Sequence, residues 1–132
     1  MEQTPQLKTI VLIDDEEVTN LINTKIISFY YKFNTISYTS ATVALEQFIG
    51  NDAGSPILPD YIFLDINMPV MDGWGFLEEF QKFPVHKTEH CKIYMLSSSI
   101  DQDDIEKTKS FPSAHGFISK PLTAEKIMIL AQ

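Results

Sequence analysis

The amino-acid sequence predicts a single α/β domain built on a doubly wound sheet of five parallel strands. Strand-like and helix-like segments alternate five times along the 132 residues, and strands separated by helices pair in parallel through right-handed crossovers. Two central runs, Ile10–Ile13 and Ile62–Leu64, are apolar without alternation, as expected when helices cover both faces of a sheet. Because the sequence has no internal repeat, low-complexity tract or sign of a second domain, we expect one domain over residues 1–132, with its core from about residue 8.

The five strands are predicted from short apolar or alternating runs. They are expected at residues 8–13, 35–39, 61–65, 92–97 and 115–120. The run at residues 35–39 alternates polar and apolar side chains, which is typical of a half-buried edge strand. The other four runs all lead into acidic, hydroxyl or amine side chains.

Five helices are predicted between and after the strands. The first three have apolar stripes at helical spacing, formed by Val18, Leu21, Ile22, Ile26 and Phe29, then by Ala41, Ala44, Leu45 and Phe48, then by Phe76, Leu77 and Phe80. The fourth helix, from Asp101 to about Lys109, has only a thin apolar face. The last has Leu122 and Ile127 at the positions of a hydrophobic staple.

Polar residues that can cap helices precede several of these stripes. Ser40, Asp72 and Thr123 are the expected N-caps of the second, third and last helices. Pro84 is expected to end the third helix, because proline cannot continue one.

Three acids are placed to meet at one edge of the sheet. Asp14 and Asp15 follow the first strand, and Asp65 ends the third; open α/β sheets bind ligands at the carboxyl ends of their strands. Three bare carboxylates repel one another, so a cation must neutralise them or one must be protonated. Hard oxygen ligands suit Mg²⁺, with Mn²⁺ as a substitute. The alternative for each single Asp is that it only caps a helix or a turn.

A hydroxyl and an amine end two further strands. Ser97 ends the fourth strand and Lys120 the fifth. Together with the acids they predict a site for a divalent cation and a phosphoryl group, because phosphoryl oxygens need donors and positive charge.

Composition and charge exclude other classes of protein. The chain is 44% hydrophobic and 21% charged, with no apolar stretch of bilayer-spanning length and no signal region, so we expect a cytoplasmic protein that does not contact a membrane. A net charge of −8 opposes direct binding of nucleic acid. The single cysteine, Cys91, excludes an internal disulfide and a multi-cysteine metal site, and we expect it to be a buried thiol.

Four motifs, each after a predicted strand, resemble the receiver domain of two-component response regulators, the class that includes the chemotaxis regulators. They are Asp14-Asp15, Asp65-Ile-Asn-Met-Pro-Val-Met-Asp-Gly73, Leu96-Ser97-Ser98 and Lys120-Pro121, and the resemblance runs from about Lys8 to the end of the chain. It implies a (βα)5 flavodoxin-like receiver fold with strand order 2-1-3-4-5. It also implies a phosphoprotein that signals by phosphorelay and is not a turnover enzyme.

The resemblance assigns a role to each matched residue. Asp65 is implied to accept the phosphoryl group from a sensor histidine kinase, a histidine phosphotransfer protein or a small phosphodonor. Asp15 is implied to bind Mg²⁺ directly and Asp14 mostly through water, with Asp65 and the backbone carbonyl of Asn67 as further ligands. Ser97 and Lys120 are implied to contact phosphoryl oxygens.

The same resemblance implies how the signal leaves the site. Phe117 falls at the position of the switch aromatic of the family, although an ordinary core aromatic explains it equally well. Ser97 and Phe117 are implied to shift a surface made by the fourth helix, the fifth strand and the last helix, which binds a downstream partner or a second copy of the domain. The Lys120–Pro121 peptide is expected in cis.

The sequence argues against three rival interpretations. A phosphatase of the haloacid dehalogenase class needs a second acid two residues after the nucleophile, where this chain has Asn67. A flavodoxin-like binding module needs a loop rich in Ser, Thr and Gly after strand one, where this chain is acidic. A degenerate receiver would lack one of the core residues. His86, His90 and His115 are expected on the surface, and the sequence does not decide whether Trp74 packs on its helix or meets a partner.

Overall fold

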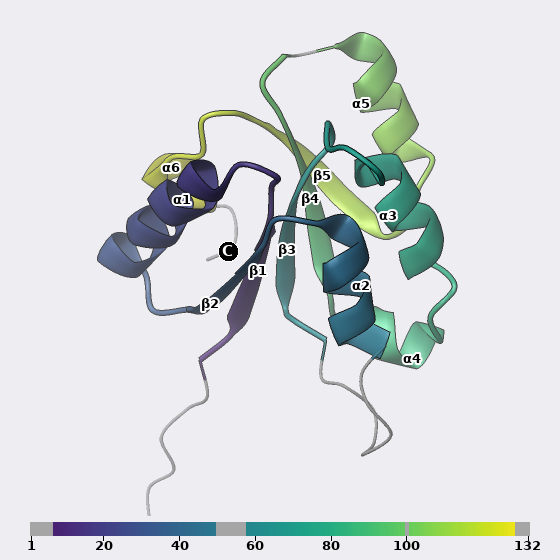
Figure 1. The fold of residues 1–132 in the computed structure, drawn as a ribbon, viewed down its shortest axis with the longest axis horizontal. Helices are drawn as coiled ribbons and strands as arrows, with labels where there is room; N and C mark the ends of the chain where they lie inside the picture. Colours follow the sequence, from purple (N-terminus) through teal and green to yellow (C-terminus); the bar gives the residue numbers. More distant parts are fainter. Residues whose placement is uncertain (1–6, 50–57, 100, 129–132) are drawn as a thin grey trace, which may run out of the picture.

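A five-stranded parallel sheet forms the middle layer of the computed structural model, which describes residues 7–49, 58–99 and 101–128. The strands are β1 (Thr9–Ile13), β2 (Asn34–Tyr38), β3 (Tyr61–Asp65), β4 (Lys92–Ser97) and β5 (Ala114–Ser119). Their order is β2-β1-β3-β4-β5, and all neighbours are parallel. The predicted fold class and strand order are therefore confirmed (Figure 1).

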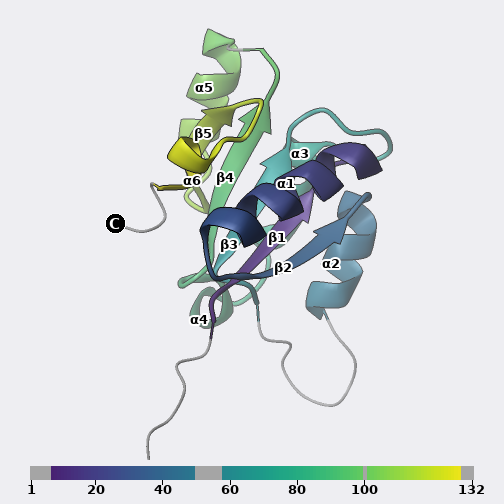
Figure 2. The same cartoon turned by 90° about the vertical axis from the view of Figure 1, so that its left-hand side faces the viewer.

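Helices cover both faces of this sheet. They are α1 (Glu17–Tyr30), α2 (Ala41–Ile49), α3 (Gly73–Phe80), α4 (Val85–Thr88), α5 (Gln102–Lys109) and α6 (Ala124–Ile127). α1 and α6 lie on one face and α2, α3 and α5 on the other (Figures 1 and 2). The four-residue α4 was not predicted, since it has no buried residue to give it a pattern. The predicted fourth and last helices are thus α5 and α6.

Two apolar clusters fill the space on either side of the sheet. Alternate residues of β1 enter different clusters: Val11 and Ile13 contact the α2 and α3 side, whereas Ile10 and Leu12 contact the side of α1 and α6. Because the side chains of a strand point alternately to its two faces, a strand buried on both faces must be apolar throughout. This explains the unbroken apolar runs of the central strands.

The caps and apolar residues predicted for α2, α3 and α6 agree with the structure. Asp72 accepts a hydrogen bond from the Gly75 N–H at 2.9 Å, and Thr123 accepts one from the Lys126 N–H at 3.2 Å. Ser40 accepts a longer one, 3.4 Å, from the N–H of Val43. The apolar stripes of α2 and α3 and the two staple residues of the last helix are buried. These residues are Ala41, Ala44, Leu45 and Phe48, then Phe76, Leu77 and Phe80, then Leu122 and Ile127.

The predicted inward face of α1 is wrong. Four residues of its apolar stripe are exposed: Val18 by 66%, Leu21 by 55%, Ile22 by 51% and Phe29 by 80%. The side that faces the sheet instead carries Asn20, Asn23 and Ile27, all buried. The side-chain amide of Asn20 donates to the backbone carbonyls of Asp14 at 3.0 Å and Tyr38 at 3.1 Å. Buried carbonyls at strand ends need donors, so a polar side chain takes the inward position.

Two expectations outside the helices also have an outcome. Cys91 is 2% exposed, and burial, with a smaller effect of the Asp60 charge, raises the pKa of its thiol to about 12. The thiol is therefore protonated at neutral pH, as expected for a buried cysteine. No helix in the described part of the chain is long and apolar enough to cross a bilayer.

Candidate functional site

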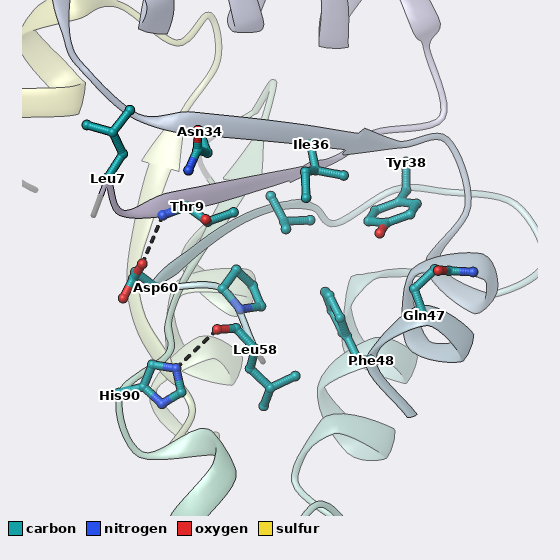
Figure 3. Close-up of a pocket in the computed structure, with 12 residues that line it drawn as sticks. Leu7, Thr9, Asn34, Ile36, Tyr38, Gln47, Phe48, Leu58, Asp60 and His90 are labelled. Carbon is teal, nitrogen blue, oxygen red and sulfur yellow. Dashed lines mark hydrogen bonds between the residues drawn. The ribbon is translucent and has the colours of Figure 1, made fainter. Parts of the chain in front are cut away.

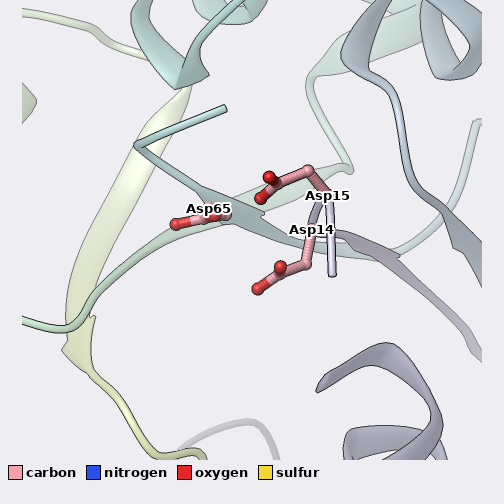
Figure 4. A group of neighbouring side chains, drawn as sticks. All are labelled: Asp14, Asp15 and Asp65. Carbon is pink, nitrogen blue, oxygen red and sulfur yellow. The ribbon is translucent and has the colours of Figure 1, made fainter. Parts of the chain in front are cut away.

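The three predicted acids meet at the carboxyl edge of the sheet. β1 and β3 are neighbours in which Ile13 pairs with Leu64. Asp14, which follows β1, and Asp65, the last residue of β3, therefore lie next to each other at this edge. A carboxylate oxygen from each of Asp14, Asp15 and Asp65 lies within 4.8 Å of the others (Figure 4). Asp14 and Asp65 are only 2% and 5% exposed, whereas Asp15 is exposed to solvent. The cluster thus has a buried base and one open side.

Lys120 brings a positive charge to this cluster from the end of β5. Its ammonium lies 2.8 Å from Asp14 Oδ2 and 3.2 Å from Asp65 Oδ1. Burial disfavours the charge of Lys120, but its hydrogen bond to Asp14 and the charges of both acids outweigh burial and raise its pKa. Lys120 is therefore fully protonated at neutral pH and offsets part of the negative charge.

One ammonium does not offset all of that charge. Burial and the neighbouring Asp14 raise the pKa of Asp65 from 3.8 to about 6, although Lys120 and the Asn67 N–H act in the opposite direction. A further cation beside Asp65 would favour its ionised form. Three clustered carboxylates, one of them open to water, fit a hard divalent ion that keeps several of its waters. The donor set is therefore suitable for Mg²⁺.

The loop after Asp65 is held close beneath the carboxylate. The Asn67 N–H donates to Asp65 Oδ1 at 3.4 Å, and the Gly73 N–H donates to the carbonyl of Ile66 at 2.8 Å. A Cβ atom on Gly73 would lie 2.9 Å from the backbone oxygen of Asp65, so the return of the loop requires glycine at this position. The expected metal contact of the Asn67 carbonyl stays a prediction.

Val70 lies at the tip of the same loop in a conformation that sequence analysis missed. Its φ is 69°, and the Met71 N–H donates to the carbonyl of Pro69 at 2.8 Å across it. A β-branched residue at positive φ is strained, and Val70 is 99% exposed, so burial of its side chain does not offset this strain. Its only sequence signal is its place between Met-Pro and Asp-Gly.

Ser97 lies next to the acids but its hydroxyl is used elsewhere. In the β3–β4 register Asp65 pairs with Leu96, so Ser97 follows directly at the same edge. The hydroxyl is fully buried, donates to the Ser99 carbonyl at 2.8 Å and accepts from the Ser99 N–H at 3.3 Å. Because a hydroxyl has one proton to donate, Ser97 must give up its bond to the Ser99 carbonyl before it can donate to a phosphoryl oxygen.

Two aromatic residues connect this edge to α5 and β5. Phe117 pairs with Met95 in the sheet and packs, partly buried, on the α2 and α3 side. Trp74 is 9% exposed and stacks on Phe111 with ring centroids 6.0 Å apart, and the Lys107 ammonium lies 4.9 Å from its ring. Of the two possibilities left open for Trp74, the structure shows packing: this α3 residue lies against the α5–β5 segment.

A separate cavity of about 540 Å³ lies at the opposite end of the sheet (Figure 3). It is lined by residues of β1, β2 and α2 and by the segments that precede β3 and β4. Its polar groups are already used in part: Asp60 accepts from the Thr9 N–H at 2.8 Å, and the His90 ring is bonded to the Leu58 carbonyl at 3.1 Å. Its lining includes none of Asp14, Asp15 and Asp65, so the cavity is separate from the acid cluster.

Comparison with known proteins identifies the family. A profile described as the response regulator receiver domain matches residues 10–132. The chain belongs to this family. Among solved structures, a two-component response regulator from Cytophaga hutchinsonii is 30% identical with a TM-score of 0.86, and the alignment covers 96% of each chain.

More distant receivers share the fold. Chemotaxis protein CheY4 from Vibrio cholerae is 18% identical with a TM-score of 0.78, over 96% of this chain and 98% of that one. A response regulator receiver protein from Dyadobacter fermentans is 23% identical with a TM-score of 0.79, over 92% and 93%. None of the curated proteins searched matches the sequence significantly. The protein is thus a receiver domain of two-component signalling, and the chemical roles of its site residues stay predictions.

Proposed function

We propose that this receiver domain accepts a phosphoryl group on Asp65 in a reaction that requires Mg²⁺. The donor is a phosphohistidine of a sensor histidine kinase or of a histidine phosphotransfer protein. The observation that carries the proposal is the ammonium of Lys120, 3.2 Å from a buried carboxylate that two further acids flank. If Asp65 only capped a turn, it would need neither the neighbouring acids nor the Lys120 ammonium.

The chemistry follows from the groups around Asp65. A carboxylate oxygen of Asp65 forms a bond to phosphorus while the bond between phosphorus and the imidazole nitrogen breaks. The leaving imidazole keeps the electron pair of that bond and takes up a proton. Because the pKa of Asp65 is about 6, most of the carboxylate is already ionised at neutral pH and can attack.

The chain's other groups position the phosphoryl oxygens. Lys120 moves from its bond with Asp14 toward a phosphoryl oxygen, and Ser97 turns its hydroxyl toward another. Asp15, Asp14, Asp65 and the Asn67 carbonyl would hold Mg²⁺, which supplies positive charge for the acids and the transferred group. Catalysis of this kind depends on positioning and electrostatics.

The domain is proposed to be a signalling switch rather than a turnover enzyme. Asn67 is exposed at the place where a phosphatase of the haloacid dehalogenase class would need an acid, and an amide cannot donate a proton to a leaving group as a carboxylic acid does. We therefore expect one phosphoryl group per chain, followed by hydrolysis of the acyl phosphate.

The output surface is proposed to consist of α5, β5 and α6. If the Ser97 hydroxyl leaves the Ser99 carbonyl and bonds the phosphoryl group, the β4–α5 loop moves inward. Phe117 can then enter the space that Ser97 has left. Trp74 contacts Phe111 and Lys107 and would move with them. This surface then has two conformations, and a downstream partner or a second copy of the domain binds one of them better. The shift between the two conformations is limited by the difference in the contacts that the phosphoryl group makes in each.

Acetyl phosphate with Mg²⁺, followed by intact mass, tests the phosphoacceptor. The wild-type chain should gain one phosphoryl group, and Asp65→Asn should gain none while remaining folded. Asp72→Asn is the matched control, because it makes the same chemical change at an N-cap, where Asn is as good as Asp. A stable, acid-labile phosphoryl group on Asp65→Asn would show that another residue is the acceptor.

A further inference from the structure

The ammonium of Lys126 makes three hydrogen bonds to the two residues that flank Lys120. Lys126 Nζ lies 2.7 Å from the carbonyl oxygen and 3.3 Å from the hydroxyl of Ser119, and 2.9 Å from the carbonyl oxygen of Pro121. A lysine ammonium has three donors, and all three are used on this turn. The peptide carbonyls on both sides of Lys120 are therefore tied to one positive charge.

The same turn is fixed to β4 on its other side. Ser97 pairs with Ser119 in the sheet, and the Lys120 N–H donates to the Ser97 carbonyl at 2.7 Å. The backbone of Lys120 is thus held by the sheet through its N–H and by Lys126 through the adjoining carbonyls. Only the side chain of Lys120 is left to move.

Lys126 itself stands on an anchored helix. Thr123 caps the Lys126 N–H at 3.2 Å, and the hydroxyl of Tyr31, just after α1, donates to the Ala124 carbonyl at 2.8 Å. Ile127, the next residue, is fully buried against the α1 side of the sheet. The ammonium of Lys126 therefore starts from a backbone that neighbouring elements hold in place.

We propose that Lys126 is a positioning residue for phosphoryl transfer: it fixes the turn that points the Lys120 ammonium at Asp65. The inference rests on the proposed function of Asp65. Lys126 touches neither the acids nor, in this proposal, the phosphoryl group. It acts through Lys120, because a small displacement of the Lys120 backbone moves its ammonium away from the transferred oxygens.

The test compares phosphorylation rates by acetyl phosphate in four chains. Lys126→Met keeps the aliphatic stem and removes the donors, and Lys126→Arg keeps donors and charge. Lys82→Met is the charge control, because Lys82 is exposed and its ammonium pairs with the exposed Glu79. Relative to wild type we expect Lys126→Met to be slower by on the order of tenfold. We expect Lys126→Arg to recover most of the rate and Lys82→Met to match wild type.

A double-mutant cycle separates positioning from a merely structural role. Lys120→Met removes the ammonium that the turn directs toward Asp65. In that background, Lys126→Met should therefore not slow the reaction further. A residue that only stabilises the fold would slow both backgrounds equally, and that result would overturn the proposal. Equal rates for Lys126→Met and wild type would overturn it too, whereas a wild-type chain that is not phosphorylated would refute the function of Asp65 itself.

Amide hydrogen exchange without metal or phosphodonor provides a readout that does not need activity. Lys126→Met should speed exchange of the Lys120 N–H by about tenfold, with the exchange of core amides in β3 unchanged. Lys126→Arg should preserve protection. An unchanged Lys120 amide in Lys126→Met would show that the three bonds do not order the turn, and the proposal would be wrong.

Discussion

Replacing Asp65 with Asn should stabilise the metal-free protein at neutral pH. Burial and Asp14 raise the pKa of Asp65 from 3.8 to about 6, so the folded state disfavours its ionised form even though Lys120 lies 3.2 Å away. A rise of this size corresponds to about 3 kcal/mol. Water at the open, Asp15 side of the cluster reduces the penalty, and we expect Asp65→Asn to gain about 1–2 kcal/mol at pH 7.5.

The sign of the pH dependence follows from the direction of the shift. Because the folded-state pKa is raised, the folded state binds more protons than the unfolded chain between pH 3.8 and about 6. The stability that protonated Asp65 contributes is full below this window and is lost as the pH rises through it. Asn has no such titration. The difference in unfolding free energy between variant and wild type should therefore be small near pH 4 and grow toward pH 7.

Urea unfolding in EDTA, followed at several pH values, measures this difference. Other titrating groups largely cancel, because both chains share them. Asp72→Asn, at an exposed helix cap, should show no comparable gain. If Asp65→Asn is less stable than wild type at pH 7.5, or if the difference does not change with pH, then Lys120 outweighs burial and Asp14, and the electrostatic account of the site is wrong.

Three further predictions address the metal, the switch and the loop. Mg²⁺ at ten times its dissociation constant should raise the melting temperature by about 4–6 °C, and Asp15→Asn but not Glu17→Gln should remove most of this gain. Beryllofluoride, a phosphoryl mimic, should shift NMR signals of α5 and β5 as well as those at the site. Ser97→Ala should still be phosphorylated at Asp65 but show smaller shifts at Phe117. Unchanged NMR signals of α5 and β5 in the wild type would refute the switch. Gly73→Ala should cost about 1–3 kcal/mol of stability, because its Cβ meets the rigid backbone of Asp65 at 2.9 Å. Gly75→Ala should cost less, because the nearest atom to its Cβ belongs to the flexible Met71 side chain; equal losses in urea unfolding would show that the Asp65 backbone gives way.

The sheet and its acids could be predicted from sequence because they depend on local pattern and on a simple geometric rule. Unbroken apolar runs imply a sheet covered on both faces, and parallel strands place their carboxyl ends together. Asp14 and Asp65 follow from these two facts without any knowledge of tertiary contacts. The caps at Asp72 and Thr123 were equally accessible, since each bonds an N–H three residues ahead.

Two details that the sequence missed or left open, the inward face of α1 and the place of Trp74, depend on tertiary partners. The inward face of α1 is set by Asn20, which bonds carbonyls at the ends of two strands, and an apolar stripe carries no information about those carbonyls. The contact between Trp74 and Phe111 joins residues far apart in the chain. The hydroxyl of Ser97 is bonded within its own loop, although its position at the site was predictable.

Through its bond to Asp14, Lys120 supplies a positive charge from within the chain that partly neutralises the acids. A single ammonium serves two acids, at 2.8 Å from Asp14 Oδ2 and 3.2 Å from Asp65 Oδ1. If that ammonium turns to a phosphoryl group, Asp14 loses its partner and becomes a better ligand for a divalent ion. By thermodynamic reciprocity, an ion that displaces Lys120 from Asp14 frees it in turn for the phosphoryl group. Metal affinity and the free energy of phosphorylation would then be coupled, because one ammonium exchanges between two anions.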